Sequence, residues 1–404
     1  MLQVPPILLL ALLALSPSAR AEDGIGTQRE ISDMIPSQHL SSATASSNNW
    51  AVLPEFGYSP DQSFNGGFKF TGRDLTSHQA TVDLEFNAAL KSQRGVDATI
   101  VVPRPFGPRT LNVDEYHYYL SPKELFFGIG NNLVRNPIAY YEIERQRALA
   151  TFGWHLTDDL VGAFSAGPRQ TKISRGRSVE AIPSVVDAFP NLIGLDGGRT
   201  NPMIVSLVYN ERRSVTRPTR GWSAIGTFEY VNQNLANDFH FFRYTLDASY
   251  LYPILGPQRV LGVHVGGEEV VGRNRYIPFF ELATLGGPND MRGFFPNRFL
   301  GRGKLVINTE YRNRLATFTF RNLWDVQIDG VLFGDIGEVF ISDAQVSRDF
   351  NVPSRNLPRE VDEFRYSYGT GLRAEIGDAI VARLDVGFSN EDVGLVYLVF
   401  GHTF

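Results

Sequence analysis

An arginine in a stretch rich in glycine and proline is the first candidate for chemistry in this sequence. Residues 284–303 read TLGGPNDMRGFFPNRFLGRG, with Arg292 near the middle and Gly293 and Phe294 directly after it. A buried guanidinium needs a carboxylate partner, because an uncompensated buried charge costs about 3–5 kcal/mol. The chemistry to look for is therefore an ion pair, and the elements around this stretch must supply the acid.

Short segments that partly match catalytic or metal-binding motifs lack the sequence context that those motifs require. The segment AFSAG around Ser165 has Ala163 where a nucleophile elbow needs glycine, and it lies in a strand pattern. The segment FGIGNN opens no helix, as a dinucleotide-binding loop would. The seven histidines show no ligand spacing, and the segment GLDGG around Asp196 offers too few oxygen ligands for calcium. We expect no enzyme activity, no metal and no cofactor.

The elements that surround Arg292 alternate in polarity with a period of two. Residues 304–315, KLVINTEYRNRL, place charged and polar side chains on even positions and apolar ones on odd positions, with Val306 as the exception. Residues 364–376 (FRYSYGTGLRAEI) and 241–252 (FFRYTLDASYLY) repeat the pattern. Successive side chains of a strand point to opposite faces, so each of these segments is a strand with one charged and one apolar face.

Two architectures use such strands. In a soluble sandwich the apolar face packs a core, whereas in a transmembrane barrel the apolar face meets lipid and the polar face lines a wet lumen. Long strands, charges of both signs on the polar face and aromatic residues near strand ends favour the barrel. About 16 strand-like segments lie between Trp50 and Phe404, an even number as such barrels require. We predict an all-β fold, an antiparallel transmembrane β-barrel of about 16 strands.

The connections between these segments differ in length. The longest fall at about 174–201, 271–300 and 341–359, and shorter turns alternate with them. This alternation is typical of barrels with short periplasmic turns and long extracellular loops.

Composition and the N-terminal residues narrow the class of protein. The chain has no cysteine, and its net charge of −5 comes from scattered residues without a basic patch, so nucleic acid is not an expected partner. Residues 1–21 have the layout of a signal peptide, although they lack a basic n-region. Residues 22–49 are rich in Ser, Thr and Asn and are expected to be a flexible periplasmic linker, which leaves residues 50–404 for the barrel.

Several motifs in the right order resemble one family. The loop GGPNDMRGF, the strands NTEYRNRL and VLFGDIGEVF, and the end VYLVFGHTF resemble the barrel of the BamA/TamA outer-membrane assembly superfamily, also called bacterial surface antigens. Residues 49–60 (NWAVLPEFGYSP) and 126–132 (FFGIGNN) resemble it too. The resemblance covers nearly all of the chain from residue 49 onward and implies the bacterial outer membrane as the location.

The resemblance assigns roles to the residues of the loop motif. It implies that Arg292, completed by Gly293 and Phe294, folds back into the lumen as a latch and pairs with Glu310 and Asp335 on the two following strands. The alternation agrees, since Glu310 lies on the charged face of its strand. Met291 stands where the family usually has valine. The alternative is that Arg292 is a solvated loop residue.

The last residues and the assembly partners follow from the same resemblance. Phe400 and the terminal Phe404 lie on the apolar face of an amphipathic strand, and the resemblance implies that such an end is the signal for insertion. Expected partners are therefore outer-membrane lipids and the assembly machinery during biogenesis, together with an unknown periplasmic partner or client.

The sequence departs from the superfamily in one respect that concerns its expected activity. Assembly members of the superfamily carry periplasmic POTRA modules before the barrel, but only about 28 residues separate the expected signal peptide from Trp50, fewer than a domain needs. Three functions stay open: a barrel that aids insertion or translocation of proteins, a pore for small polar solutes, and a non-catalytic component that organises the envelope or presents a surface antigen.

Overall fold

The computed structural model describes most of the chain from Trp50 to Phe400. The described residues are 50–73, 79–131, 136–177, 182–212, 218–320, 324–341, 364–376 and 380–400. The expected signal peptide, the linker at 22–49 and Phe404 lie outside the described residues.

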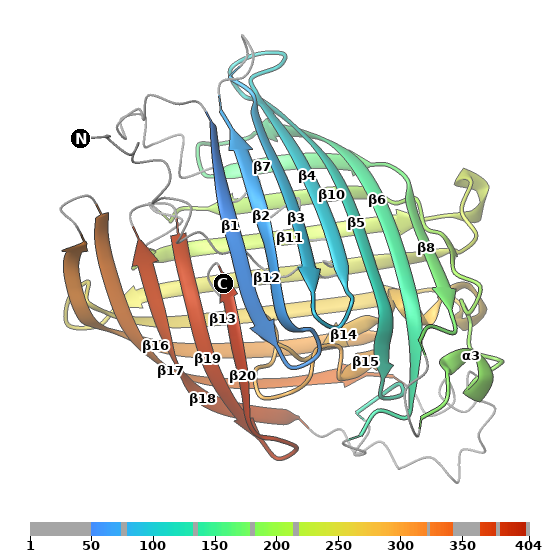
Figure 1. The fold of residues 1–404 in the computed structure, drawn as a ribbon. Coiled ribbons are helices and arrows are strands. Elements are labelled where there is room, and N and C mark those ends of the chain that lie inside the picture. Colours follow the sequence, from blue (N-terminus) through green and yellow to red (C-terminus); the bar gives the residue numbers. More distant parts are fainter. Residues whose placement is uncertain are drawn as a thin grey trace, which may run out of the picture.

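The described chain is almost entirely β-structure, wound into a barrel (Figure 1). The strands of its sheet are β1 (Trp50–Ser59), β2 (Ser63–Gly72), β3 (Thr81–Ala89), β4 (Arg94–Pro103), β5 (Thr110–Phe126), β6 (Ala139–His155), β7 (Leu160–Ala166), β8 (Arg169–Ser174), β9 (Gly198–Arg199), β10 (Met203–Asn210), β11 (Gly221–Val231), β12 (Phe241–Pro253), β13 (Arg259–Val271), β16 (Gly303–Phe320), β17 (Trp324–Phe340), β18 (Arg365–Ile376), β19 (Ile380–Ser389) and β20 (Val393–Phe400).

These 18 segments form 16 barrel strands among the described residues. Both β7 and β8 pair with β6, β7 along residues 150–155 and β8 along residues 142–147, so they are two halves of one strand broken at Gly167 and Pro168. The short β9 and β10 continue each other in the same way, against β8 and β7. The predicted antiparallel barrel of about 16 strands is confirmed.

The sheet closes where the first strand meets the last. β1 pairs with β2 over ten residue pairs, from Trp50↔Gly72 to Ser59↔Ser63. Its other edge meets β20 through the pair Tyr58↔Leu398 in the part of the chain that the structure describes. In Figure 1, β1 (blue) and β20 (red) lie next to each other at this seam.

The two faces of the strands have the polarity that a lipid environment requires. In β18, Tyr366 and Tyr368 are exposed on the outer face, while Arg365 and Ser367 are buried toward the lumen. A water-soluble sandwich would bury the apolar face instead. Apolar side chains outside and charged side chains inside are typical of a barrel that spans a membrane. Among the described residues, no helix is long and apolar enough to cross a membrane.

The long connections all lie at one end of the barrel, because consecutive antiparallel strands turn alternately at the two ends. The connections 175–197 and 272–302 belong to this loop end. β17 ends and β18 begins at the same end, and residues 342–363 between them lie outside the described residues. The loop end also carries the helix α3 (Val185–Ala188) and the 3-10 helix η1 (Gln233–Leu235). The opposite end, which we call the turn end, has the short connections at 104–109 and 254–258.

Candidate functional site in the barrel lumen

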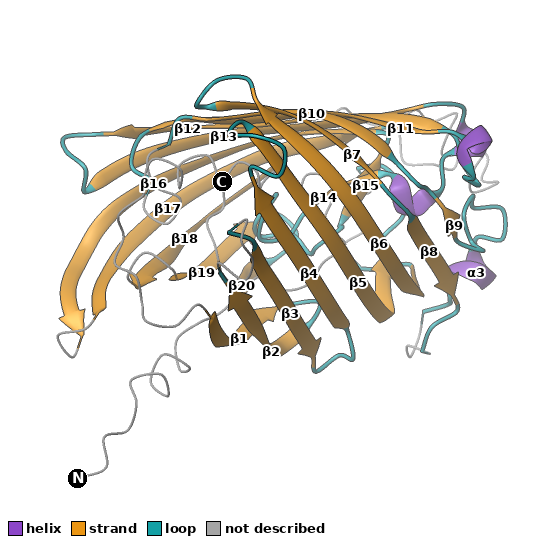
Figure 2. Cartoon of the chain, turned by 90° about the horizontal axis from the view of Figure 1, so that it is seen from above, coloured by secondary structure: helices purple, strands orange, loops and turns teal. Residues whose placement is uncertain are grey.

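The connection between β13 and β16, residues 272–302, folds into the barrel, and we call it the lumen loop (Figure 2). It contains two 3-10 helices and a two-stranded ribbon: η2 (Asn274–Tyr276), η3 (Phe279–Glu281), β14 (Ala283–Leu285) and β15 (Phe299–Gly301). The ribbon holds residues 286–298 as a closed hairpin. The sequence motif around Arg292 is therefore presented from a fixed base, against the inner wall.

Apolar packing under the hairpin fixes its position. Met291 and Phe294 are fully buried in one cluster with Phe299 and with Val306 of β16. Val306 is the residue that breaks the alternation in its strand, and it does so because the lumen loop covers it. A residue that is apolar on the lumen face therefore marks the place where the loop docks.

A pair of glycines lets the hairpin lie directly on the barrel wall. Gly293 has φ 87°, a left-handed conformation that side chains rarely adopt. Opposite it, a Cβ placed on Gly387 of β19 would lie 2.5 Å from the backbone nitrogen of Gly293. The approach of the two backbones thus depends on the absence of a side chain at both positions.

Substituting Gly387 tests this close approach. We expect Gly387→Val to push the hairpin off β19 and to lower the free energy of unfolding by about 1–3 kcal/mol, as overpacking does. The measurement is urea unfolding in detergent, with protease cleavage of the lumen loop as the local readout. Gly226→Val in β11 is the matched control, because a Cβ there meets nothing within 4 Å. Equal effects of the two substitutions would contradict the role of Gly387.

The guanidinium of Arg292 lies between two carboxylates on neighbouring strands. Its Nε and Nη2 donate to the two carboxylate oxygens of Asp335 (β17) at 2.8 and 2.6 Å, and its backbone N–H donates to Asp335 at 3.1 Å. Nη1 forms an ion pair with Glu310 of β16. The ring of Phe333 lies 3.6 Å from the guanidinium carbon. The structure thus brings Arg292, Glu310 and Asp335 together, fully buried in the lumen; their role as a latch stays a prediction.

Further charges on β16, β18 and β19 extend this pairing into a network. Glu310 also accepts from Arg312 and Arg373, each at 2.9 Å. Arg373 in turn donates to Asp385 at 2.6 Å, and Arg383 lies 3.3 Å from the same carboxylate.

Burial lowers the pKa of the Arg292 guanidinium, but the neighbouring Asp335 and Glu310 carboxylates outweigh burial and raise it above its ordinary value. Arg292 is therefore charged, and its charge belongs to a network of side chains on four strands.

The motif residues also bind the last hairpin, β19–β20. The hydroxyl of Tyr397 (β20) donates to the carbonyl of Phe294 at 2.7 Å and accepts from the Gly293 N–H at 3.2 Å. Arg298 donates through Nε and Nη2 to the carboxylate of Glu391, in the β19–β20 turn, at 2.7 and 2.8 Å. The lumen loop thus holds the strand that forms one side of the seam.

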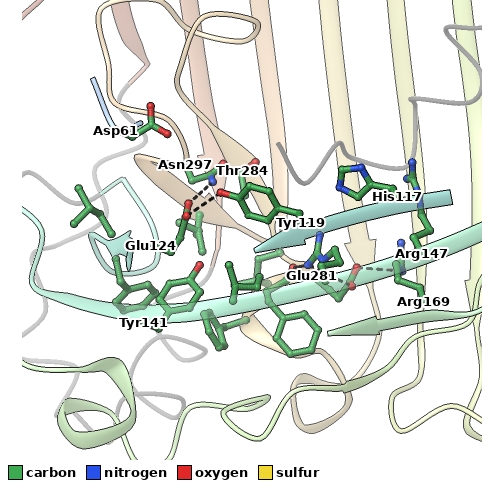
Figure 3. Close-up of a pocket in the computed structure, with 18 of the residues that line it drawn as sticks. Asp61, His117, Tyr119, Glu124, Tyr141, Arg147, Arg169, Glu281, Thr284 and Asn297 are labelled. Carbon is green, nitrogen blue, oxygen red and sulfur yellow. Dashed lines mark hydrogen bonds and ion pairs between the residues drawn. The ribbon is translucent and has the colours of Figure 1, made fainter. Parts of the chain in front are cut away.

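A second anchor, which sequence reasoning missed, lies at the beginning of the lumen loop. Glu281 of η3 is buried against arginines of the opposite wall: Arg243 of β12 at 2.7 Å, Arg169 of β8 at 3.2 Å and Arg145 of β6 at 3.8 Å (Figure 3). Burial raises the pKa of the Glu281 carboxyl, but these arginines lower it to about 2. The loop therefore crosses the lumen with a carboxylate fixed to one wall and a guanidinium fixed to the other.

The sequence also singled out Ser165, Phe400 and Phe404. Ser165 lies buried in β7 and accepts a hydrogen bond from the hydroxyl of Thr151 at 2.8 Å. Within the described ranges, no group of three or more histidine, aspartate or glutamate side chains is arranged to hold a metal ion. Phe400 is the last residue of β20 and Phe404 lies outside the described residues, so the insertion signal stays a prediction.

Barrels similar to this one occur among solved structures. A search of curated proteins finds no match. Among solved structures, BamA from Haemophilus ducreyi lacking POTRA domains 1–3 is similar, with a TM-score of 0.64 and 14% identity over 88% of this chain and 70% of that one.

Two CdiB barrels are also similar. CdiB from Escherichia coli gives a TM-score of 0.57 at 11% identity, and CdiB from Acinetobacter baumannii gives 0.53 at 11%. The match covers 89% and 87% of this chain but only 64% and 59% of theirs, less than two thirds of the length of either CdiB chain. At these identities the similarities show the barrel fold alone.

The family itself is shown by the sequence. The domain model of the Omp85 superfamily matches residues 49–404, which are nearly the whole chain. The predicted resemblance to BamA-type barrels is confirmed, and this chain belongs to the Omp85 superfamily.

Proposed function

We propose that this Omp85 barrel resides in the bacterial outer membrane and aids the insertion or translocation of proteins there, as a non-catalytic component. The seam between β1 and β20 carries the proposal. Among the described residues, one pair, Tyr58↔Leu398, joins the two strands, whereas ten pairs join β1 to β2. Such a seam costs little to open, and opening exposes the N–H and C=O groups of both strand edges to a new partner.

An opened edge gives the chemistry that a client strand needs. Free backbone donors and acceptors on β1 or β20 pair with an incoming extended segment by β-augmentation. Inside a membrane, a strand can enter only if its backbone groups are satisfied, because no water is present to bond them. The class of client that fits is therefore an unfolded outer-membrane protein with amphipathic strands.

The lumen loop supports the seam from inside. Tyr397, which bonds to Phe294 and Gly293 of the loop, is the neighbour of Leu398, the seam residue on β20. The loop also occupies the lumen, which counts against a wide pore for polar solutes. Delivery of clients by a periplasmic partner, and insertion of the barrel itself by the assembly machinery, belong to the same proposal.

A disulfide across the seam tests the proposal. The chain has no cysteine, so Tyr58→Cys with Leu398→Cys introduces the only two thiols, on residues that face each other as antiparallel partners. We expect the reduced protein in proteoliposomes to accelerate folding of an added eight-stranded outer-membrane barrel, and the oxidised protein to lose most of this acceleration.

The control is a disulfide in a closed part of the wall. Ala224→Cys with Ala248→Cys joins partners of β11 and β12 and should leave the acceleration unchanged in both redox states. If the seam disulfide forms and the client folds equally fast with it, the seam is not the site of insertion.

A further inference from the structure

Apart from the Arg292 latch, a row of basic side chains lines the lumen wall on β5, β6 and β8. His117 of β5 lies directly across from Arg147 of β6, and Arg147 lies directly across from Arg169 of β8. Arg145, two residues before Arg147, points to the same face. Like charges placed opposite each other on neighbouring strands destabilise a sheet. This row therefore needs negative charge close to it.

Carboxylates compensate one end of the row but hardly its centre. Arg169 is satisfied by Glu229 at 2.5 Å and by Glu281 at 3.2 Å. For Arg147, the nearest recorded acid is Glu115, at 3.8 Å. The Arg147 side chain is only 8% exposed, yet its Nε has no hydrogen-bond partner among the described residues. A buried guanidinium with donors left over is unusual, because buried polar groups are almost always bonded.

His117 has an unbonded nitrogen in the same place. Its Nδ1 lies within hydrogen-bonding distance of the carboxylate of Asp97 on β4. The other ring nitrogen, Nε2, is buried and has no partner within the described part of the chain. Because Asp97 takes Nδ1, Nε2 is the ring nitrogen left for a ligand, to which an N–H at that position would donate.

These groups border a cavity beside the lumen loop. It has a volume of about 80 Å³, and His117, Arg145, Arg147 and Arg169 lie along it with Tyr119 (Figure 3). A cavity of this size holds several water molecules or one small polyatomic ion. Asp61, Glu124 and Glu281 also line the cavity, and Glu281 is paired with Arg169 and Arg243. The unbonded nitrogens of Arg147 and His117 among the described residues therefore favour an anion beside them.

We propose that this cavity binds a small oxyanion of the phosphate or carboxylate type, with Arg147 and Nε2 of His117 as its donors. The planar guanidinium presents two parallel N–H groups, which match two oxygens of such an anion. The bound anion lies next to the cross-strand pair Arg147 and Arg169 and neutralises part of their repulsion. The site is separate from the seam and from the Arg292 latch, and it does not depend on protein insertion.

Phosphate titration of the purified full chain in detergent tests the site. Isothermal titration with inorganic phosphate, at an ionic strength held constant with chloride, should show saturable binding to one site. We expect Arg147→Gln to weaken this binding about tenfold or more, since hydrogen bonds to charged groups contribute that much. His117→Gln, which keeps an amide for Asp97, should weaken it as well. Arg259→Gln is the matched control, because Arg259 is an exposed arginine at the turn end.

The outcomes separate cleanly. Binding no stronger than that of chloride, or equal binding by the wild type and by the Arg147 and His117 variants, overturns the proposal. If Arg147→Gln fails to fold, His117→Gln gives the same decision. Acetate and a sugar phosphate serve as further probes: competition by the sugar phosphate indicates an oxyanion carried on a larger solute, whereas competition by the free ions alone indicates a free anion, and both support the site.

Discussion

Replacing Arg292 with alanine is expected to lower the free energy of unfolding by about 3–5 kcal/mol, the cost of leaving buried charges unpaired. Asp335 receives three of its hydrogen bonds from Arg292, and Glu310 receives one. Both carboxylates are fully buried, so water cannot replace the lost donors without displacing the loop. Urea unfolding in detergent measures the loss, and protease cleavage within residues 286–298 measures the release of the hairpin.

An arginine outside the network is the control for the lost charge. Arg259→Ala removes the same charge from an exposed position, where Nε bonds only to Asn313 at 3.3 Å in the recorded contacts. We expect it to change the unfolding free energy by less than about 0.5 kcal/mol. Comparable losses for Arg292→Ala and Arg259→Ala would show that the network does not hold the loop.

Release of the hairpin has a second readout in planar bilayers. The wild type should give a small, flickering conductance, because the lumen loop occupies the barrel. Arg292→Ala should give larger or less stable conductance steps as the loop leaves the wall. A large, steady conductance that is the same in both proteins would instead describe an open pore in which Arg292 has no part.

The barrel was predictable because its signal is local. In β18, the alternation of Arg365 and Ser367 with Tyr366 and Tyr368 can be read from the sequence alone, and it fixes which residues face lipid. Strand borders were harder where the backbone is irregular. β5 contains a bulge between Ser121 and Glu124, which breaks the period and blurs the pattern between residues 111 and 156.

The candidate site was predictable only in part. Glu310 and Asp335 could be predicted from the resemblance of the loop motif and from the charged faces of the two strands that follow it. Arg373, Asp385 and Tyr397 could not be predicted. Their contacts with Glu310, Arg292 and Phe294 depend on the register of strands 63 to 103 residues away, and one sequence does not determine that register.

The sequence around Glu281 gives only a weak indication that this residue anchors the loop. Residues 277–285, IPFFELATL, contain one charged side chain among apolar ones. A lone carboxylate in such a segment must find a buried partner or lie at the surface. The pattern gives no sign that its partners stand on β6, β8 and β12, since nothing local connects a loop glutamate to arginines 38 to 136 residues away.

Replacing Glu281 with glutamine is the second change from which we expect a large effect. The substitution keeps the shape of the side chain but removes the charge that lies 2.7 Å from Arg243 and 3.2 Å from Arg169. Glu229 still pairs with both arginines, so the loss should be about 2–4 kcal/mol, somewhat below that expected for Arg292→Ala. Urea unfolding measures it, with Glu211→Gln as the control, because Glu211 is an exposed carboxylate at the turn end.

The pH dependence of the same variant separates the charge of Glu281 from its packing. The pKa of Glu281 is about 2 in the folded protein, below its ordinary value of 4.5. Its stabilisation should therefore be complete above pH 4.5 and disappear as the pH falls toward 2. The difference in unfolding free energy between wild type and Glu281→Gln should accordingly be constant from pH 7 to pH 5 and shrink below pH 4. A difference that persists at pH 2 would mean that the glutamine disturbs packing, and that the carboxylate is not what fixes the loop to this wall.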